Sequence, residues 1–241
     1  MPQGGVEAVD RALKILAAFA TEREELALHQ LARITGLHKT TILRIAASLE
    51  RHGYLRRTGS GIFRLGSMPW RLGGVYRRNF NVGDAVRPIL DGLVEATEES
   101  ASYYVREGDV RVCLYRRNSP RPARHHIDEG EHLPLDRGSG GHILLAFAGA
   151  AGALYDQIRS TGYHVSSGER DPDVAGISVA IFNGEGKCCG VLVLSGLKSR
   201  FTREAVDRFL PLALTAAQRL TADLGGLWPE RLQPAMAVAS E

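Results

Sequence analysis

The segment 28–52 has the spacing of a helix-turn-helix, and this feature most constrains how the chain can fold. Two helices that cross at a steep angle need a small residue where they touch, supplied by Ala32. They also need a glycine in the turn, supplied by Gly36 four residues later, and apolar residues then follow at helical spacing. The sequence therefore predicts helices over 29–34 and about 38–52.

The predicted second helix turns a set of polar side chains away from the core, where they can enter a major groove. Arginine and lysine can donate to guanine or to phosphate, and threonine offers a hydroxyl and a methyl group. The candidate DNA-contacting residues of this helix are His38, Lys39, Thr40, Thr41, Arg44 and Ser48. A helix-turn-helix that serves only protein contacts is the alternative.

The charge of the chain is unevenly distributed. Residues 1–78 contain 13 Lys and Arg against 6 Asp and Glu, whereas the whole chain has a formal net charge of only +3. Residues 26–49 contain no acidic residue. Because phosphate neutralisation supplies much of the affinity for DNA, this pattern indicates a polyanionic partner. An ordinary basic, solvent-exposed face is the alternative.

A helix before this motif and a hairpin after it complete a predicted winged helix. The first helix should bury the apolar residues that recur every three or four positions, namely Val6, Val9, Leu13, Leu16 and Ala20. Residues 54–57 and 62–65 flank a glycine-containing turn and are predicted to form a β-hairpin. Its arginines, Arg56, Arg57 and Arg64, are candidate contacts to phosphate or the minor groove, although exposed arginines are common on any edge strand.

The rest of the chain has the pattern of a second, α+β module. Helices are expected over about 82–99, 142–148 and 203–224, and strands over 102–106, 110–116, 177–182 and 189–195. We therefore predict an α+β protein with an N-terminal winged helix-turn-helix domain (1–67) and a linker helix (68–81). An antiparallel-sheet domain (82–226) and a flexible tail (227–241) follow.

Motifs for catalysis or metal binding are missing from the sequence. Ser139 has Arg137 where a nucleophile elbow requires glycine. No P-loop, CxxC or HExxH motif occurs, so we expect no enzyme activity, no cofactor and no metal. A redox- or metal-sensing DNA-binding regulator that uses Cys113, Cys188, Cys189 and the histidines is an alternative, and an enzyme with an attached DNA-binding module is another.

The glycine-rich turn 138–141 precedes a predicted helix and is a candidate ligand contact. Such a turn can present unpaired backbone N–H groups and the positive end of the helix dipole to a carboxylate. A plain helix-entry turn is the alternative. Ser195, with Leu133 and two apolar helix residues nearby, is expected to line a mostly apolar pocket.

The sequence also bears on where in the cell the protein is located. No apolar run is long enough to cross a bilayer, and the first residues lack the basic-then-apolar order of a signal peptide. The odd number of cysteines suggests no disulfide framework. We expect a cytoplasmic protein without membrane contacts.

Several segments resemble the IclR family of bacterial transcriptional regulators, and the resemblance extends over residues 6–224. Residues 9–16 resemble the family's V-x-R-A-L-x-I-L start, and residues 31–44 match its L-A-x-x-T-G-L-x-K-S/T-T-x-x-R pattern. Further similar segments are 49–55, 63–66, 162–163, 167–169, 174–182 and 195–196.

The resemblance implies a GAF-like effector-binding domain in the C-terminal module. It implies a homodimer or homotetramer that binds a double-stranded DNA operator, more often as a repressor, and senses a small organic or aromatic acid. The effector-binding residues that it implies are Leu133, Gly138, Ser139, His142, Glu169, Gly176, Val193 and Ser195. The family often has G-K-A where this chain has Gly141-His142-Ile143, which points to a ligand that is larger or less anionic than a simple keto acid.

Overall fold

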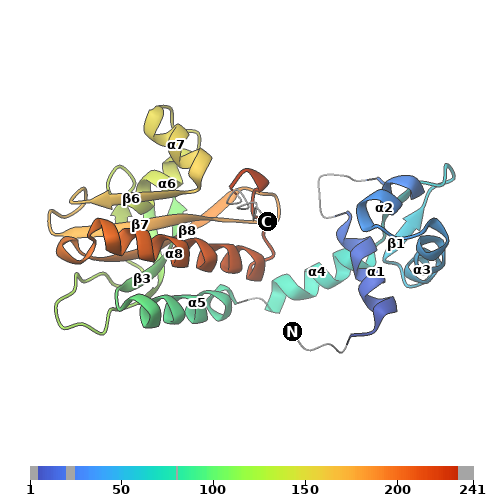
Figure 1. Ribbon diagram of the computed structural model, residues 1–241, viewed down its shortest axis with the longest axis horizontal. Helices are drawn as coiled ribbons and strands as arrows, with labels where there is room; N and C mark the ends of the chain where they lie inside the picture. Colours follow the sequence, from blue (N-terminus) through green and yellow to red (C-terminus); the bar gives the residue numbers. More distant parts are fainter. Residues whose placement is uncertain (1–4, 20–24, 80, 233–241) are drawn as a thin grey trace, which may run out of the picture. The chain divides into compact units, whose positions relative to one another are not determined.

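The computed structural model describes residues 5–19, 25–79 and 81–232, without the side chains of 76–79. The chain divides into two compact units, Met1–Phe80 and Asn81–Glu241. Each unit has its own elements (Figure 1), with one apolar core in the first unit and two in the second. The predicted linker helix falls within the first unit.

The first unit is a winged helix-turn-helix, as predicted. Its elements are α1 (Glu7–Ala17), α2 (Leu28–Thr35), α3 (Lys39–Arg51), β1 (Leu55–Arg57), β2 (Phe63–Leu65) and α4 (Met68–Asn79). Gly36 ends α2 with a φ of 70°, a left-handed conformation that glycine adopts at no steric cost. Leu26 forms an isolated antiparallel bridge with Phe63, which ties the segment before α2 to the wing.

Most of the apolar face predicted for the first helix is wrong, and of its five residues Leu16 packs against the core. Val6, Val9 and Leu13 are 66%, 53% and 57% exposed, whereas Ile15 is fully buried. Ala18 and Phe19, just beyond the helix, join Ile15 in the core, and Ala20 lies outside the described residues. The helix has apolar residues on more than one side, and helical periodicity alone cannot tell which side packs inward.

The second unit is built on a six-stranded antiparallel sheet with the order β5-β4-β3-β8-β7-β6. The strands are β3 (Ser100–Glu107), β4 (Val110–Arg117), β5 (His132–Pro134), β6 (Tyr163–Ser167), β7 (Val174–Phe182) and β8 (Cys188–Leu197). The helices are α5 (Val82–Thr97), α6 (Ser139–Phe147), α7 (Ala153–Thr161) and α8 (Arg203–Asp223), with short 3-10 turns η1 (Lys198–Arg200) and η2 (Glu230–Leu232).

Helices cover both faces of this sheet. Side chains alternate along a strand, so Ile177, Val179 and Ile181 of β7 pack with α5 and α8 on one face. Ala180 and Phe182 belong to a separate core with α6 and α7 on the other face. The central strands β7 and β8 are therefore buried on both sides, and the sheet carries two apolar cores.

Three elements and part of the C-terminal segment differ from the sequence-based expectations. Strands β5 and β6 and helix α7 were not predicted; β5 has only three residues, and β6 lies at the edge of the sheet. The prediction of a flexible tail from residue 227 onward is wrong for the segment that ends at Leu232, because Leu232 is only 7% exposed. Trp228 packs edge-on against Phe182, with ring centroids 5.6 Å apart, because both side chains gain apolar burial there. Residues 233–241 lie outside the described residues.

No helix in the described part of the chain is long and apolar enough to cross a lipid bilayer.

Candidate functional site

The outer face of α3 in the first unit is polar and cationic. Ile42 and Ala46 are buried in the core of the unit. His38, Lys39, Thr40, Arg44 and Ser48 are exposed, and Thr41 is half-buried. The first turn of α3 contains no acidic residue, so the positive end of the helix dipole is not neutralised there. The face predicted from the helix-turn-helix spacing is therefore open to a partner.

The wing presents its arginines in two different environments. Arg56 and Arg64 occupy directly opposed positions on β1 and β2 and share one face of the hairpin. Arg64 forms an ion pair with Glu25. Arg57 lies on the other face, where its guanidinium carbon is 5.4 Å from the centre of the Phe63 ring. Part of the predicted positive charge is thus already compensated within the protein.

A small cavity lies in the second unit, beside the N-terminus of α6 and the neighbouring strands. The volume open to the centre of a water molecule is about 40 Å³. Six of the eight residues that the resemblance implied line it, namely Leu133, Gly138, Ser139, Gly176, Val193 and Ser195. His142 and Glu169 are outside the lining, but Glu169 Oε2 accepts a hydrogen bond of 3.2 Å from the Gly138 N–H.

Two of the amides of the glycine-rich turn that were expected to be unpaired are already paired within the protein. The Gly138 N–H donates to Glu169, and the Ser139 N–H donates to Ser166 Oγ at 2.9 Å. The Ser178 hydroxyl in turn donates to Ser139 Oγ at 2.7 Å. The carboxylate that the helix N-terminus favours is therefore supplied by the protein itself.

Two arginines that the sequence analysis did not select line the cavity. They are Arg111 on β4 and Arg170 in the loop between β6 and β7. Arg111 donates to the carbonyl oxygen of Arg137 at 2.8 Å, and burial lowers the pKa of its guanidinium to about 10, so it keeps its charge at neutral pH. The described lining residues include no Asp or Glu. An arginine between two valines is the ordinary alternation of a half-exposed strand, so no local pattern indicated that Arg111 faces the interior.

A half-buried, neutral histidine completes the polar part of the cavity. Burial, reinforced by Arg116 and Arg170, lowers the pKa of His125 to about 4. Its Nε2 lies 3.2 Å from Ser195 Oγ, so the two side chains form a hydrogen bond across the cavity wall. Burial also raises the pKa of Tyr104 to about 12, which keeps this lining residue neutral. The cavity therefore combines two cations with neutral hydrogen-bonding groups.

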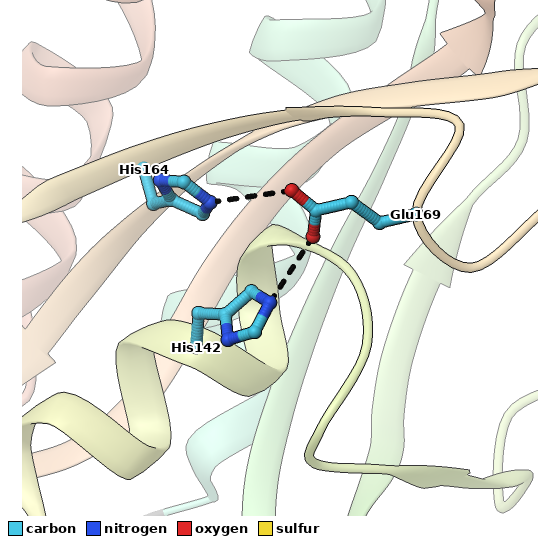
Figure 2. A group of neighbouring side chains, drawn as sticks. All are labelled: His142, His164 and Glu169. Atoms are coloured by element: carbon cyan, nitrogen blue, oxygen red, sulfur yellow. Dashed lines mark ion pairs between the residues drawn. The ribbon is translucent and has the colours of Figure 1, made fainter. Parts of the chain in front are cut away.

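A second polar group lies next to the cavity and contains His142, His164 and Glu169 (Figure 2). His142 Nε2 is 3.1 Å from Glu169 Oε2, and His164 Nε2 is 3.7 Å from Glu169 Oε1. The histidine side chains are 14% and 16% exposed, against 36% for Glu169. Burial lowers the pKa of His164, and Glu169 opposes that shift. His142 and Glu169 were among the residues expected to bind an effector, whereas His164 was not.

The cysteines lie in environments that disfavour the thiolate. Burial raises the pKa of Cys113 to about 11 and that of Cys188 to about 12, and it raises the pKa of Cys189 as well. Because the thiolate is the form that reacts and binds metals, these three residues have the properties of structural cysteines.

The two units define a class of protein, a DNA-binding transcriptional regulator with a winged helix-turn-helix and an antiparallel-sheet domain. The family model described as the IclR helix-turn-helix domain matches residues 8–59. The model of the bacterial transcriptional regulator IclR C-terminal domain matches residues 152–222. The chain belongs to the IclR family.

Individual relatives are distant but match over most of their length. The HTH-type transcriptional regulator KipR of Bacillus subtilis (strain 168) is 22% identical over 84% of this chain and 91% of its own length. The transcriptional repressor IclR of Escherichia coli (strain K12) is 23% identical over 93% of this chain and 92% of its own length.

Solved structures share the fold. A crystal structure from Silicibacter sp. TM1040, assigned to IclR transcriptional regulators, has a TM-score of 0.85 at 23% identity and covers 95% of this chain and 100% of that chain. The crystal structure of Pseudomonas aeruginosa HmgR has a TM-score of 0.77 at 22% identity, and the match covers 92% of this chain and 99% of that chain.

Proposed function

We propose that this regulator is a repressor whose affinity for its operator changes when a small organic acid binds in the cavity of the second unit. The observation that carries this proposal is the charge of the cavity. Arg111 and Arg170 line it, and no carboxylate does so among the described residues. Two cations in a lining without a carboxylate favour an anionic ligand, because a carboxylate accepts strong hydrogen bonds from guanidinium groups.

The volume of the cavity bears on the size of the acid. About 40 Å³ holds only a few water molecules, since one water needs about 10–15 Å³ of this kind of volume. A ligand of more than a few heavy atoms requires side chains such as Val193 to move. The absence of a lysine in α6 pointed to a less anionic ligand, but Arg111 and Arg170 supply positive charge from β4 and a loop instead.

DNA binding is proposed for the exposed face of α3 and for the wing. The residues are those predicted from the sequence: His38, Lys39, Thr40, Thr41, Arg44, Ser48, Arg56, Arg57 and Arg64. The supporting observations are the exposure of the α3 side chains and the absence of acidic residues in its first turn. Arg44 and Lys39 are the cations that we propose for the major groove.

A second copy of the chain is the proposed partner in the assembly. The first unit exposes large apolar residues at two helices. At α1 they are Val6, Val9 and Leu13, and on α4 they are Trp70, Leu72 and Val75. A homodimer that buries such residues would place two α3 helices on half-sites about 34–36 Å apart. We expect Leu13→Glu to lower the mass measured by light scattering after size-exclusion chromatography, and an unchanged mass would contradict this interface.

The ligand proposal is tested by fluorescence anisotropy on DNA taken from upstream of the protein's own gene and its neighbours, with a panel of small organic and aromatic acids. One acid should release or tighten wild-type binding to a specific site. Arg170→Ala should keep DNA affinity and weaken the response to that acid by about 10–100-fold, as expected for the loss of a charged hydrogen bond. Arg106→Ala, an exposed arginine outside the cavity lining, is the matched control. An equal response in both variants would contradict the assignment of the cavity.

A further inference from the structure

We propose that His142, His164 and Glu169 form a binding site for a divalent transition-metal ion of the zinc type. Within the described part of the chain, this is the group of three potential ligand residues whose donor atoms all lie within 4.8 Å of one another. Two imidazoles and a carboxylate are ligands that zinc accepts, and three protein ligands leave one position for water or a further ligand. The site does not depend on the proposed response to an acid.

The spacing of the donor atoms fits a single ion. Two ligands at about 2.0–2.2 Å from a tetrahedral zinc ion lie about 3.3–3.6 Å apart. The measured separations between the histidine Nε2 atoms and the oxygens of Glu169, 3.1 Å and 3.7 Å, are on either side of that range. Figure 2 shows both rings directing a nitrogen toward the carboxylate, each toward a different oxygen of Glu169. An ion between them requires only small shifts.

The hydrogen bonds of the group are incomplete without a further partner. His164 Nε2 is buried, and its 3.7 Å separation from Glu169 is too long for a hydrogen bond. His142 Nδ1 is also buried without a hydrogen-bond partner among the described residues. A buried polar atom without a partner is costly, and an ion bound at His164 Nε2 would remove that cost.

The three ligands come from elements that form one local framework. His142 lies in the first turns of α6, His164 lies on the edge strand β6, and Glu169 lies in the loop that joins β6 to β7. The backbone N–H of Gly168, next to Glu169, donates to the Val174 carbonyl and closes this loop. An ion would therefore connect the start of α6 to the edge of the sheet.

The site also contacts the cavity through Glu169. The same carboxylate accepts a hydrogen bond from Gly138, which lines the cavity, and Arg170 lines it from the next position in the chain. Bound metal would hold this part of the cavity wall in place. This consequence rests on the proposed acid response, whereas metal binding itself is measured without DNA or acid.

The test is a titration of the full-length, chelator-treated protein with CoCl2 and ZnCl2. One Co²⁺ per chain should produce visible absorption of a four- or five-coordinate ion without a thiolate charge-transfer band, and Zn²⁺ should displace it. Mg²⁺ should not compete, because it prefers oxygen ligands in an octahedral arrangement. Wild type that binds neither Co²⁺ nor Zn²⁺, or that shows a thiolate band lost in a variant with all three cysteines changed to serine, would overturn the proposal.

Two variants locate the ion. Glu169→Gln should weaken Co²⁺ binding by about a hundredfold or more, since even the loss of an outer-shell partner costs about 10–100-fold. His142→Lys should abolish binding while its ammonium pairs with Glu169, which preserves the fold as checked by circular dichroism. The matched control is His126→Gln, because His126 Nε2 lies 3.0 Å from Asp128 Oδ1 in an exposed pair outside the group. Unchanged affinity in Glu169→Gln and His142→Lys would exclude the site.

Discussion

Arg56 and Arg64 lie directly opposite each other on the two strands of the wing, and Arg64 is paired with Glu25. Like charges in opposed positions of an antiparallel pair are destabilising. Among the described residues, Arg56 has no carboxylate partner that would offset this repulsion. An arrangement of this kind is favoured when a polyanion, such as the DNA backbone, supplies the missing negative charge.

The first prediction separates these two arginines. Arg56→Ala should weaken operator binding more than Arg64→Ala, because the charge of Arg64 is already compensated by Glu25. Arg56→Ala should also leave the melting temperature unchanged or slightly higher, since it removes a cross-strand repulsion. Anisotropy titrations and thermal melts of both variants test this. Equal losses of DNA affinity would show that the Glu25 pair opens on binding.

The second prediction concerns α3. Arg44→Ala should weaken operator binding by about 1–3 kcal/mol if Arg44 reads a base, and it should relax specificity at one position of the site. If Arg44 contacts phosphate instead, the variant should reduce the slope of log affinity against log salt by about 1. Titrations at several salt concentrations on operator and unrelated DNA distinguish the two. Binding equal to wild type on both DNAs would exclude Arg44 from the interface.

The third prediction concerns Gly141, the third residue of α6. A Cβ at this position would overlap the carbonyl oxygen of Leu135 and the guanidinium of Arg111. Gly141→Ala should therefore lower the free energy of unfolding by about 1–3 kcal/mol. Gly92→Ala on α5 is the matched control, because no atom lies within 4 Å of a Cβ there and alanine favours the helix by about 0.5–1 kcal/mol. Urea unfolding should give opposite signs for the two changes.

The fourth prediction follows from the lowered pKa of His125. The unfolded chain protonates this histidine near pH 6.5 and the folded protein only near pH 4, so the unfolded state binds more protons between these values. The contribution of His125 to stability is therefore complete above pH 6.5 and decreases as the pH falls toward 4. Arg116, Arg170 and Arg200 favour the neutral ring, and Asp171 opposes them.

Urea unfolding at pH 7.5 and pH 5 measures this dependence. Wild type should lose more stability over the interval than His125→Gln, which has no group to protonate at this position. His126→Gln, at an exposed neighbouring position, should behave as wild type. A pH dependence that is the same in wild type and His125→Gln would contradict the assignment.

Local patterns in the sequence predicted the elements that local interactions specify. Ala32 and Gly36 placed the helix-turn-helix, because a close helix crossing and a left-handed turn each need a particular small residue. The resemblance to the IclR family implied six of the residues that line the cavity. It did not predict Arg111 and Arg170, whose side chains reach the cavity only through the pairing of β4 and the course of the loop after β6.

The sequence by itself determined the elements of the winged helix, the α+β class and the cationic face of α3, since these depend on residue spacing over a few turns. Tertiary structure decided which side of α1 is buried, because packing against the rest of the first unit selected Ile15 over Leu13. It also placed His164 beside His142 and Glu169, through the pairing of β6 with β7. Contacts between residues distant in the chain depend on how the sheet and helices assemble, and no local pattern encodes that assembly.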